Sequence, residues 1–201
     1  MRNMPKKVDK EERKELIMSS ALAVFAREGY REANLSLIAE ESGISRPTVY
    51  QYFNDKNDIY YYAVKLVTGK MFKRYSAIAW AENDDTELDR IFKIFKDVLD
   101  YASTHDATVS NLMEFMLSEK KRGVDFSKVI EERTIKLIIL LKRLLRQGIS
   151  NNTIKKCDVE AVSRNLFYLI ESCCFQVAVF RTFDRDAAIS LITSYLEFLK
   201  A

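Results

Sequence analysis

The sequence contains very little proline and glycine. Of its 201 residues only two are proline and five are glycine, and both prolines precede Thr48. Because proline interrupts helices, its absence from residue 48 onward leaves that whole stretch able to be helical. Leu, Ile, Lys, Glu and Ala dominate the periodic segments there, which is typical of helical proteins. The sequence therefore predicts an all-α protein.

Histidine and cysteine are also scarce. No cysteine lies near the single histidine, His105, so we expect no zinc site and no other metal site. The odd count of Cys157, Cys173 and Cys174, with no secretory leader, favours reduced thiols and a cytoplasmic location. No Ser/His/Asp or Cys/His arrangement and no glycine-rich phosphate loop is present. We expect no catalytic residue and no cofactor, and predict that the protein is not an enzyme.

Long apolar runs are missing as well. The best candidate, residues 135–145, is interrupted by Lys136, Lys142 and Arg143, whereas a membrane span needs about 20 apolar residues. We therefore expect no membrane partner. The formal net charge is only +3, but residues 1–75 carry 14 Lys and Arg against 10 Asp and Glu. A mildly basic N-terminal part suits a surface that faces nucleic-acid phosphates.

Hydrophobic periodicity predicts about nine helices joined by short polar turns. Asp158 and Asp184 are placed to cap the last two helices, and Gly29 to end the first. The expected ranges are residues 10–28, 35–42, 46–53, 57–79, 86–103, 106–119, 126–150, 158–181 and 184–200.

Residues 34–56, NLSLIAEESGISRPTVYQYFNDK, have the pattern of a helix-turn-helix. Asn34 can cap a first helix, Gly43 can reverse the chain with a positive φ, and Ser45 can cap a second helix. Pro47 is tolerated because it falls in a first helical turn. The side chains predicted to face inward are those of Leu35, Ile38, Ala39, Ser42, Ile44, Val49 and Phe53.

The outward side chains of the second helix have the chemistry of base recognition. An arginine such as Arg46 matches guanine O6 and N7, and a glutamine such as Gln51 matches adenine N6 and N7. The methyl group of Thr48 can contact that of thymine. A helix-turn-helix whose second helix carries these groups indicates a DNA-binding motif.

These residues resemble the DNA-binding head of TetR-type (TetR/AcrR family) transcriptional regulators. The resemblance covers about residues 10–67. Beyond it, only the length, the helical content and the turn at residues 145–149, LRQGI, are similar to the family. The matching positions are Ala23, Phe25, Gly29-Tyr30, Ile38-Ala39, Ser42-Gly43-Ile44-Ser45, Pro47-Thr48-Val49-Tyr50, Tyr52-Phe53 and Lys56.

The resemblance implies roles in DNA binding for ten positions of this motif. Asn34 would cap its helix beside a phosphate, Ser36 would lie at the groove edge, and Lys56 would pair with a phosphate. Four alternatives stay open. Ser45 could be a cap only, Tyr50 mostly core, Arg46 and Lys56 ordinary solvated charges, and Pro47 a residue that acts only by fixing φ. The implied DNA-binding residues are Asn34, Ser36, Ser45, Arg46, Pro47, Thr48, Tyr50, Gln51, Tyr52 and Lys56.

The predicted helix over residues 158–181 is apolar nearly all round, so both of its sides need cover. With the final helix, residues 184–200, it could form an isologous four-helix dimer interface, as the TetR resemblance also implies. The alternative is a monomer whose core covers both helices. A dimer would present two recognition helices to a palindrome, about 34–36 Å apart.

A ligand pocket would lie inside the C-terminal part, and its apolar composition favours an apolar or aromatic effector. The alternative is that the aromatic and Met side chains there only pack the core. The candidate pocket walls are Trp80, Phe92, Phe95, Tyr101, Met113, Phe115, Met116, Phe167 and Tyr168.

We therefore expect a TetR-like all-α chain with four parts. Residues 1–9 would be a flexible arm, 10–56 a three-helix DNA-binding domain and 57–79 a connecting helix, followed by a helical bundle over 80–201 for ligand sensing and dimerisation. The predicted function is that of a dimeric regulator of double-stranded DNA, most simply a repressor released from a palindromic operator by an unidentified small-molecule effector. The alternative is a DNA-binding adaptor controlled by a protein partner.

Overall fold

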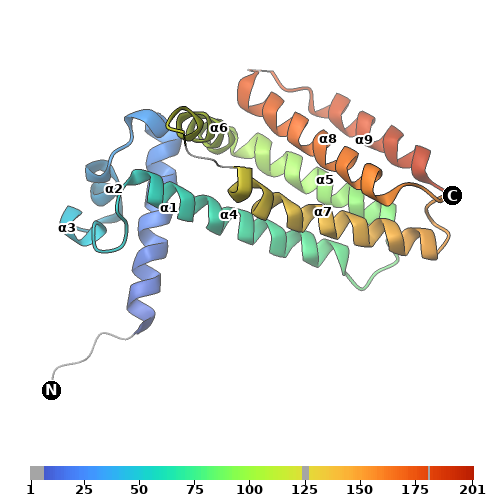
Figure 1. The fold of residues 1–201 in the computed structure, drawn as a ribbon, viewed down its shortest axis with the longest axis horizontal. Coiled ribbons are helices and arrows are strands. Elements are labelled where there is room, and N and C mark those ends of the chain that lie inside the picture. The colour runs from blue at the N-terminus through green and yellow to red at the C-terminus, as the bar shows by residue number, and fades with distance from the viewer. Residues whose placement is uncertain (1–6, 124–126, 181) are drawn as a thin grey trace. The chain divides into compact units, whose positions relative to one another are not determined.

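The computed structural model describes residues 7–123, 127–180 and 182–201. These residues form nine α-helices, and the only bridge of β type among them is the isolated pair Ile154 and Lys200, which confirms the all-α prediction (Figure 1). None of these helices is long and apolar enough to span a bilayer. The helices are α1 (Lys7–Glu32), α2 (Leu35–Ser42), α3 (Arg46–Val49), α4 (Lys56–Ala79), α5 (Glu87–Thr104), α6 (Asp106–Lys121), α7 (Ser127–Ser150), α8 (Val159–Val179) and α9 (Arg185–Leu199).

Two of the predicted helix ends differ from the observed ones by four residues, and the other ends by three or fewer. The first helix continues to Glu32, but Gly29 breaks it with φ 80° and ψ 158°, a backbone conformation that side-chain-bearing residues rarely adopt. The third helix was predicted to reach Phe53 but ends at Val49. Its continuation through Tyr52 is a tight turn, in which the Tyr52 N–H bonds the oxygen of Val49, only three residues back.

The chain packs as two compact units that divide within α4, between Val67 and Thr68. In the first unit, α1 packs on α2, and α2 on α3. On α1 the Leu16 side chain lies outside this core and is 47% exposed. The buried side chains of this unit include Ile17, Ala21, Val24, Phe25, Tyr30, Ile38, Ala39, Val49, Phe53, Ile59 and Tyr60.

In the second unit, α5 packs against α7, α8 and α9, while α6 packs on α8 (Figure 1). The core is aliphatic and aromatic and draws on α4, α5, α7, α8 and α9. Two carboxylate side chains of this unit, Glu87 and Glu119, are buried. The Glu87 carboxylate accepts hydrogen bonds from Asn151 Nδ2 (2.7 Å) and Thr153 Oγ1 (2.5 Å), which ties the start of α5 to the loop before α8.

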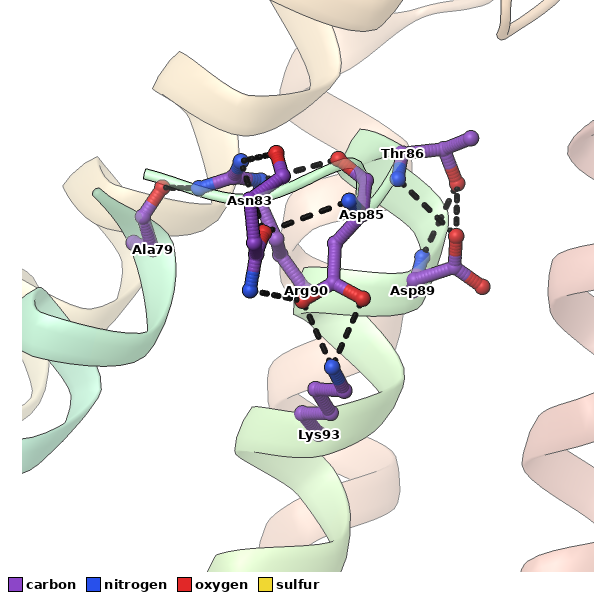
Figure 2. Close-up of polar contacts among 7 residues, drawn as sticks. All are labelled: Ala79, Asn83, Asp85, Thr86, Asp89, Arg90 and Lys93. Carbon is purple, nitrogen blue, oxygen red and sulfur yellow. Dashed lines mark hydrogen bonds and ion pairs between the residues drawn. The ribbon is translucent and has the colours of Figure 1, made fainter. Parts of the chain in front are cut away.

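Figure 2 shows the polar contacts that join the end of α4 to the start of α5. Arg90 Nη1 donates to the Ala79 carbonyl oxygen at 2.8 Å, and Arg90 Nε donates to the Asp85 carbonyl oxygen at 3.2 Å. Arg90 Nη2 also reaches Asn83 Oδ1 at 3.3 Å, and Lys93 bonds the Asp85 carboxylate. Because Arg90 satisfies a carbonyl of the last α4 turn, this end of α4 is fixed to α5.

Candidate nucleic-acid interface

The helix α2 begins and ends as its sequence predicts. Asn34 has extended backbone angles, and its Oδ1 accepts hydrogen bonds from the backbone N–H groups of Ser36 (3.0 Å) and Leu37 (3.1 Å). At the other end Gly43 adopts the left-handed conformation, with φ 64° and ψ 19°. This glycine reverses the chain and sets the angle between α2 and α3.

The helix α3 is held at its start by Ser45. Its Oγ accepts a hydrogen bond from the Thr48 N–H at 3.3 Å and lies 2.8 Å from Thr48 Oγ1. Pro47 falls in the first turn, where its missing N–H costs nothing. Val49 and Phe53 are fully buried and anchor the segment in the core of the first unit. The opposite edge of α3 therefore faces solvent.

The predicted DNA-binding side chains differ in how far they are exposed to solvent. Thr48, Tyr52 and Lys56 are half-buried. Arg46 packs along its neighbour one turn later: its guanidinium lies 5.7 Å from the Tyr50 ring centre, and Nη2 donates to the Tyr50 hydroxyl at 3.3 Å. The exposed members of the set are Asn34, Ser36, Ser45, Arg46, Pro47, Tyr50 and Gln51.

Lys56 has a role that the sequence did not indicate. Its Nζ donates hydrogen bonds to the backbone oxygens of Tyr30 (2.9 Å), Arg31 (2.8 Å) and Ala33 (3.0 Å). An ammonium group has three donors, so all three are engaged at the end of α1. The resemblance implies a phosphate partner for Lys56. In this structure the ammonium instead caps a helix C-terminus, where a positive charge is favoured.

An aromatic cluster supports this cap. The rings of Phe25 and Tyr60 meet edge-on at 4.8 Å, and those of Tyr30 and Tyr60 at 5.1 Å. Tyr30 also donates its hydroxyl to Asn57 Oδ1 and lies with its ring 4.9 Å from Lys56 Nζ. These contacts join α1 to the start of α4. Sequence reasoning missed them because the partners are 26 or more residues apart.

The predicted pocket residues of the second unit occupy different environments. Phe95, Phe115 and Phe167 are buried, whereas Trp80 is 48% and Tyr168 57% exposed. A side chain that lines an interior pocket must be buried, so we no longer count Trp80 and Tyr168 as pocket candidates. The half-buried members are Phe92, Tyr101, Met113 and Met116.

Large apolar side chains also remain exposed on α8 and α9. They lie seven and four residues apart on α8 and seven apart on α9, so each set lies on one helix face. The opposite face of α8, with Leu166, Ile170 and Cys173, is buried in the core. We call the exposed set the α8–α9 apolar surface, and its members are Tyr168, Phe175, Val179, Leu191 and Phe198.

Comparison with known proteins decides what this head is. The family described as "Bacterial regulatory proteins, tetR family" matches residues 17–62, which contain α2, α3 and the turn between them. This chain carries a TetR-family DNA-binding head at residues 17–62. It is a DNA-binding transcriptional regulator, as the sequence predicts, and the relatives that it matches are regulators rather than enzymes.

The rest of the TetR fold is matched as well. The chain is 22% identical over 149 residues to the uncharacterized HTH-type transcriptional regulator YhgD of Bacillus subtilis, covering 74% of this chain and 75% of YhgD. A TetR transcription regulator from Haloarcula marismortui superposes with a TM-score of 0.84 at 19% identity, covering 95% of this chain and all of that one. FadR from B. subtilis, in complex with stearoyl-CoA, gives 0.72 at 22% identity, covering 93% and 97%.

Proposed function

We propose that this protein is a dimeric TetR-family repressor that binds a palindromic operator in the cytoplasm and is released by an apolar small molecule. The observation that carries the proposal is the outer edge of α3. Arg46, Pro47 and Gln51 are exposed there, while Val49 and Phe53 on the other side are buried in the head. An edge of this kind can enter the major groove without any rearrangement of the head core.

The individual contacts follow from this placement. Arg46 and Gln51 are assigned to base edges, and the exposed hydroxyl side of Tyr50 to a phosphate. Asn34 and Ser36, exposed at the start of α2, are assigned to the neighbouring backbone phosphates, where the helix N-terminus adds a favourable dipole. Lys56 acts in this proposal by fixing α1 to α4 beneath the motif.

The α8–α9 apolar surface supports the dimer. Phe175 is 50% and Phe198 68% exposed, which is costly for side chains of this size in a monomer. Pairing of α8 and α9 with the same two helices of a second copy would cover both copies at once. Two heads would then face two half-sites of one palindrome.

Substitution of Phe175 tests the dimer. Phe175→Glu places a charge in each half of the proposed interface. If each of the two copies loses about 1.5 kcal/mol of binding free energy, the dimer Kd rises about a hundredfold. Sedimentation velocity should show monomers at micromolar concentration. The matched control is Leu117→Glu on α6, which changes a side chain that is 61% exposed outside the α8–α9 apolar surface. Equal effects of the two substitutions, or none, would rule out this interface.

The effector proposal has two supports. The core of the second unit is built from aliphatic and aromatic side chains, among them Phe95 and Phe167, which suits an apolar ligand. The FadR neighbour was solved with stearoyl-CoA, whose acyl chain is of that class. A ligand can release the operator only by the difference between its affinities for the DNA-bound and free conformations.

One experiment tests the operator and the effector together. DNase footprinting with the DNA upstream of the protein's own gene should show a protected palindrome, and a ligand with a long apolar chain should remove the protection. Protection that no apolar ligand removes would favour the adaptor controlled by a protein partner. No protection of any upstream DNA at micromolar protein would contradict the repressor.

A further inference from the structure

Two buried polar atoms in the second unit have no hydrogen-bond partner. Among the described residues these are the Tyr75 hydroxyl on α4 and Asp97 Oδ2 on α5. Tyr75 is only 5% exposed and belongs to the core. Buried polar groups are nearly always paired, because an unpaired one costs about 1–3 kcal/mol. Two such atoms, one on α4 and one on α5, therefore need an explanation.

The two atoms lie in one neighbourhood. Burial, followed by the negative charge of Asp97, raises the pKa of Tyr75 well above its usual range, so the phenol stays protonated and can donate. Burial likewise raises the pKa of the nearby Cys174 thiol on α8 to about 11. The half-buried ring of Tyr101, a predicted pocket wall, belongs to the same region. Three helices thus bring a donor, an acceptor and apolar walls together.

The negative charge of Asp97 already has a positive partner. The other carboxylate oxygen of Asp97, Oδ1, accepts a hydrogen bond from Arg74, so one positive and one negative side chain offset each other. A ligand carboxylate would bring a second negative charge beside Asp97, and an ammonium would bring a surplus positive charge. Burial of an unbalanced charge is expensive. A neutral group that both donates and accepts fits the pair best.

We propose that Tyr75 and Asp97 bind the uncharged polar end of the effector, a hydroxyl or a primary amide, while its apolar part occupies the core between α4, α5 and α8. The ligand would donate to Asp97 Oδ2 and accept from the Tyr75 hydroxyl. This inference rests on the proposed control by a small molecule and specifies its chemistry. Because Tyr75 lies on the helix that begins in the head unit, the same contacts would couple ligand binding to α4.

The test compares probes that share a chain and differ at one end: 1-decanol, decanamide, decanoate and decylamine. Binding to the full-length protein is measured by calorimetry and by the shift in melting temperature. Decanol and decanamide should bind wild type at least about tenfold more tightly than decanoate and decylamine. Equal binding of the four, or no binding of decanol and decanamide, would overturn the proposal.

Two substitutions make the test specific. Tyr75→Phe and Asp97→Asn should each weaken decanol binding about three- to tenfold and leave operator binding of the ligand-free protein unchanged. Tyr75→Phe should also raise the melting temperature without ligand, since it removes an unpaired buried hydroxyl. The matched control, Tyr195→Phe, changes a half-buried core tyrosine on α9 and should alter neither quantity.

The outcomes separate this inference from the proposed function. If Tyr75→Phe lowers the melting temperature, a bridging water or another group already satisfies the hydroxyl, and the inference is wrong. If apolar ligands release operator DNA regardless of their polar end, the proposed repressor function is supported and the assignment of Tyr75 and Asp97 is wrong. If wild type binds no operator, the proposed function itself has failed, whatever the probes do.

Discussion

Replacement of Lys56 by methionine separates two roles that one side chain could have. Met keeps most of the length and apolar volume of Lys but removes the ammonium. In the structure this ammonium donates to three backbone oxygens, those of Tyr30, Arg31 and Ala33, at 2.8–3.0 Å. Because Lys56 lies at the surface and is half-buried, the three bonds do not add in full. A partly buried cation at a helix C-terminus stabilises by up to about 2 kcal/mol, which is the loss that we expect.

The assay has two readouts. Urea denaturation followed by circular dichroism gives the free energy of unfolding, and fluorescence anisotropy with operator DNA over a range of salt gives the salt dependence of binding. A helix cap predicts lower stability and weaker binding with an unchanged salt slope. Lys70→Met, which removes an exposed lysine from the same helix, should leave the stability unchanged.

A direct phosphate contact predicts the opposite pattern. Each phosphate neutralised by the protein contributes about 0.9 to the slope of log K against log salt. If Lys56→Met keeps wild-type stability and makes the slope shallower by about 1, the cap interpretation is wrong and the phosphate contact implied by the family resemblance is right.

Three further predictions concern the groove-facing edge and the core. Arg46→Ala should cost about 1–3 kcal/mol in operator binding with little effect on random DNA; an equal loss on both in anisotropy titrations would make Arg46 a phosphate contact. Gly148→Ala should destabilise the protein by about 1 kcal/mol in urea denaturation, because the added Cβ would lie 2.4 Å from Cδ1 of buried Ile154. Gly69→Ala has open space around it and should instead stabilise the protein by up to about 1 kcal/mol. Burial raises the pKa of Glu87, but the hydrogen bonds to its carboxylate outweigh burial and leave the pKa lowered. Wild type should therefore be more stable than Glu87→Gln at neutral pH and lose that advantage below about pH 4. A difference in melting temperature that does not depend on pH would contradict this.

Local structure was predictable where one residue decides it. Asn34, Asp158 and Asp184 cap the helices that they were expected to cap, because an Asn or Asp side chain bonds backbone N–H groups two or three residues later. Gly43 likewise supplies the positive φ that the turn requires. The α3 helix was overestimated because Val49 and Phe53 are both buried, as positions i and i+4 of a helix would be, although the chain between them forms a turn.

Contacts between distant residues were not predictable in the same way. Periodicity tells which side of a helix is buried but not which partner it meets, so nothing in the sequence joined Lys56 to the end of α1 or Glu87 to the loop before α8. The unpaired atoms of Tyr75 and Asp97 were missed for the same reason. Trp80 and Tyr168 were taken as pocket walls from their residue type alone, and both are about half exposed.

The proposed repressor requires one dimer to hold two α3 edges at a fixed spacing. The most direct measurement is the affinity for the footprinted palindrome before and after insertion of five base pairs between its half-sites, which turns one half-site to the opposite face of the duplex. We expect the insertion to weaken binding at least about a hundredfold, to the level of a single half-site. Equal affinity for the two DNAs would mean that the heads bind independently, and would contradict the proposal.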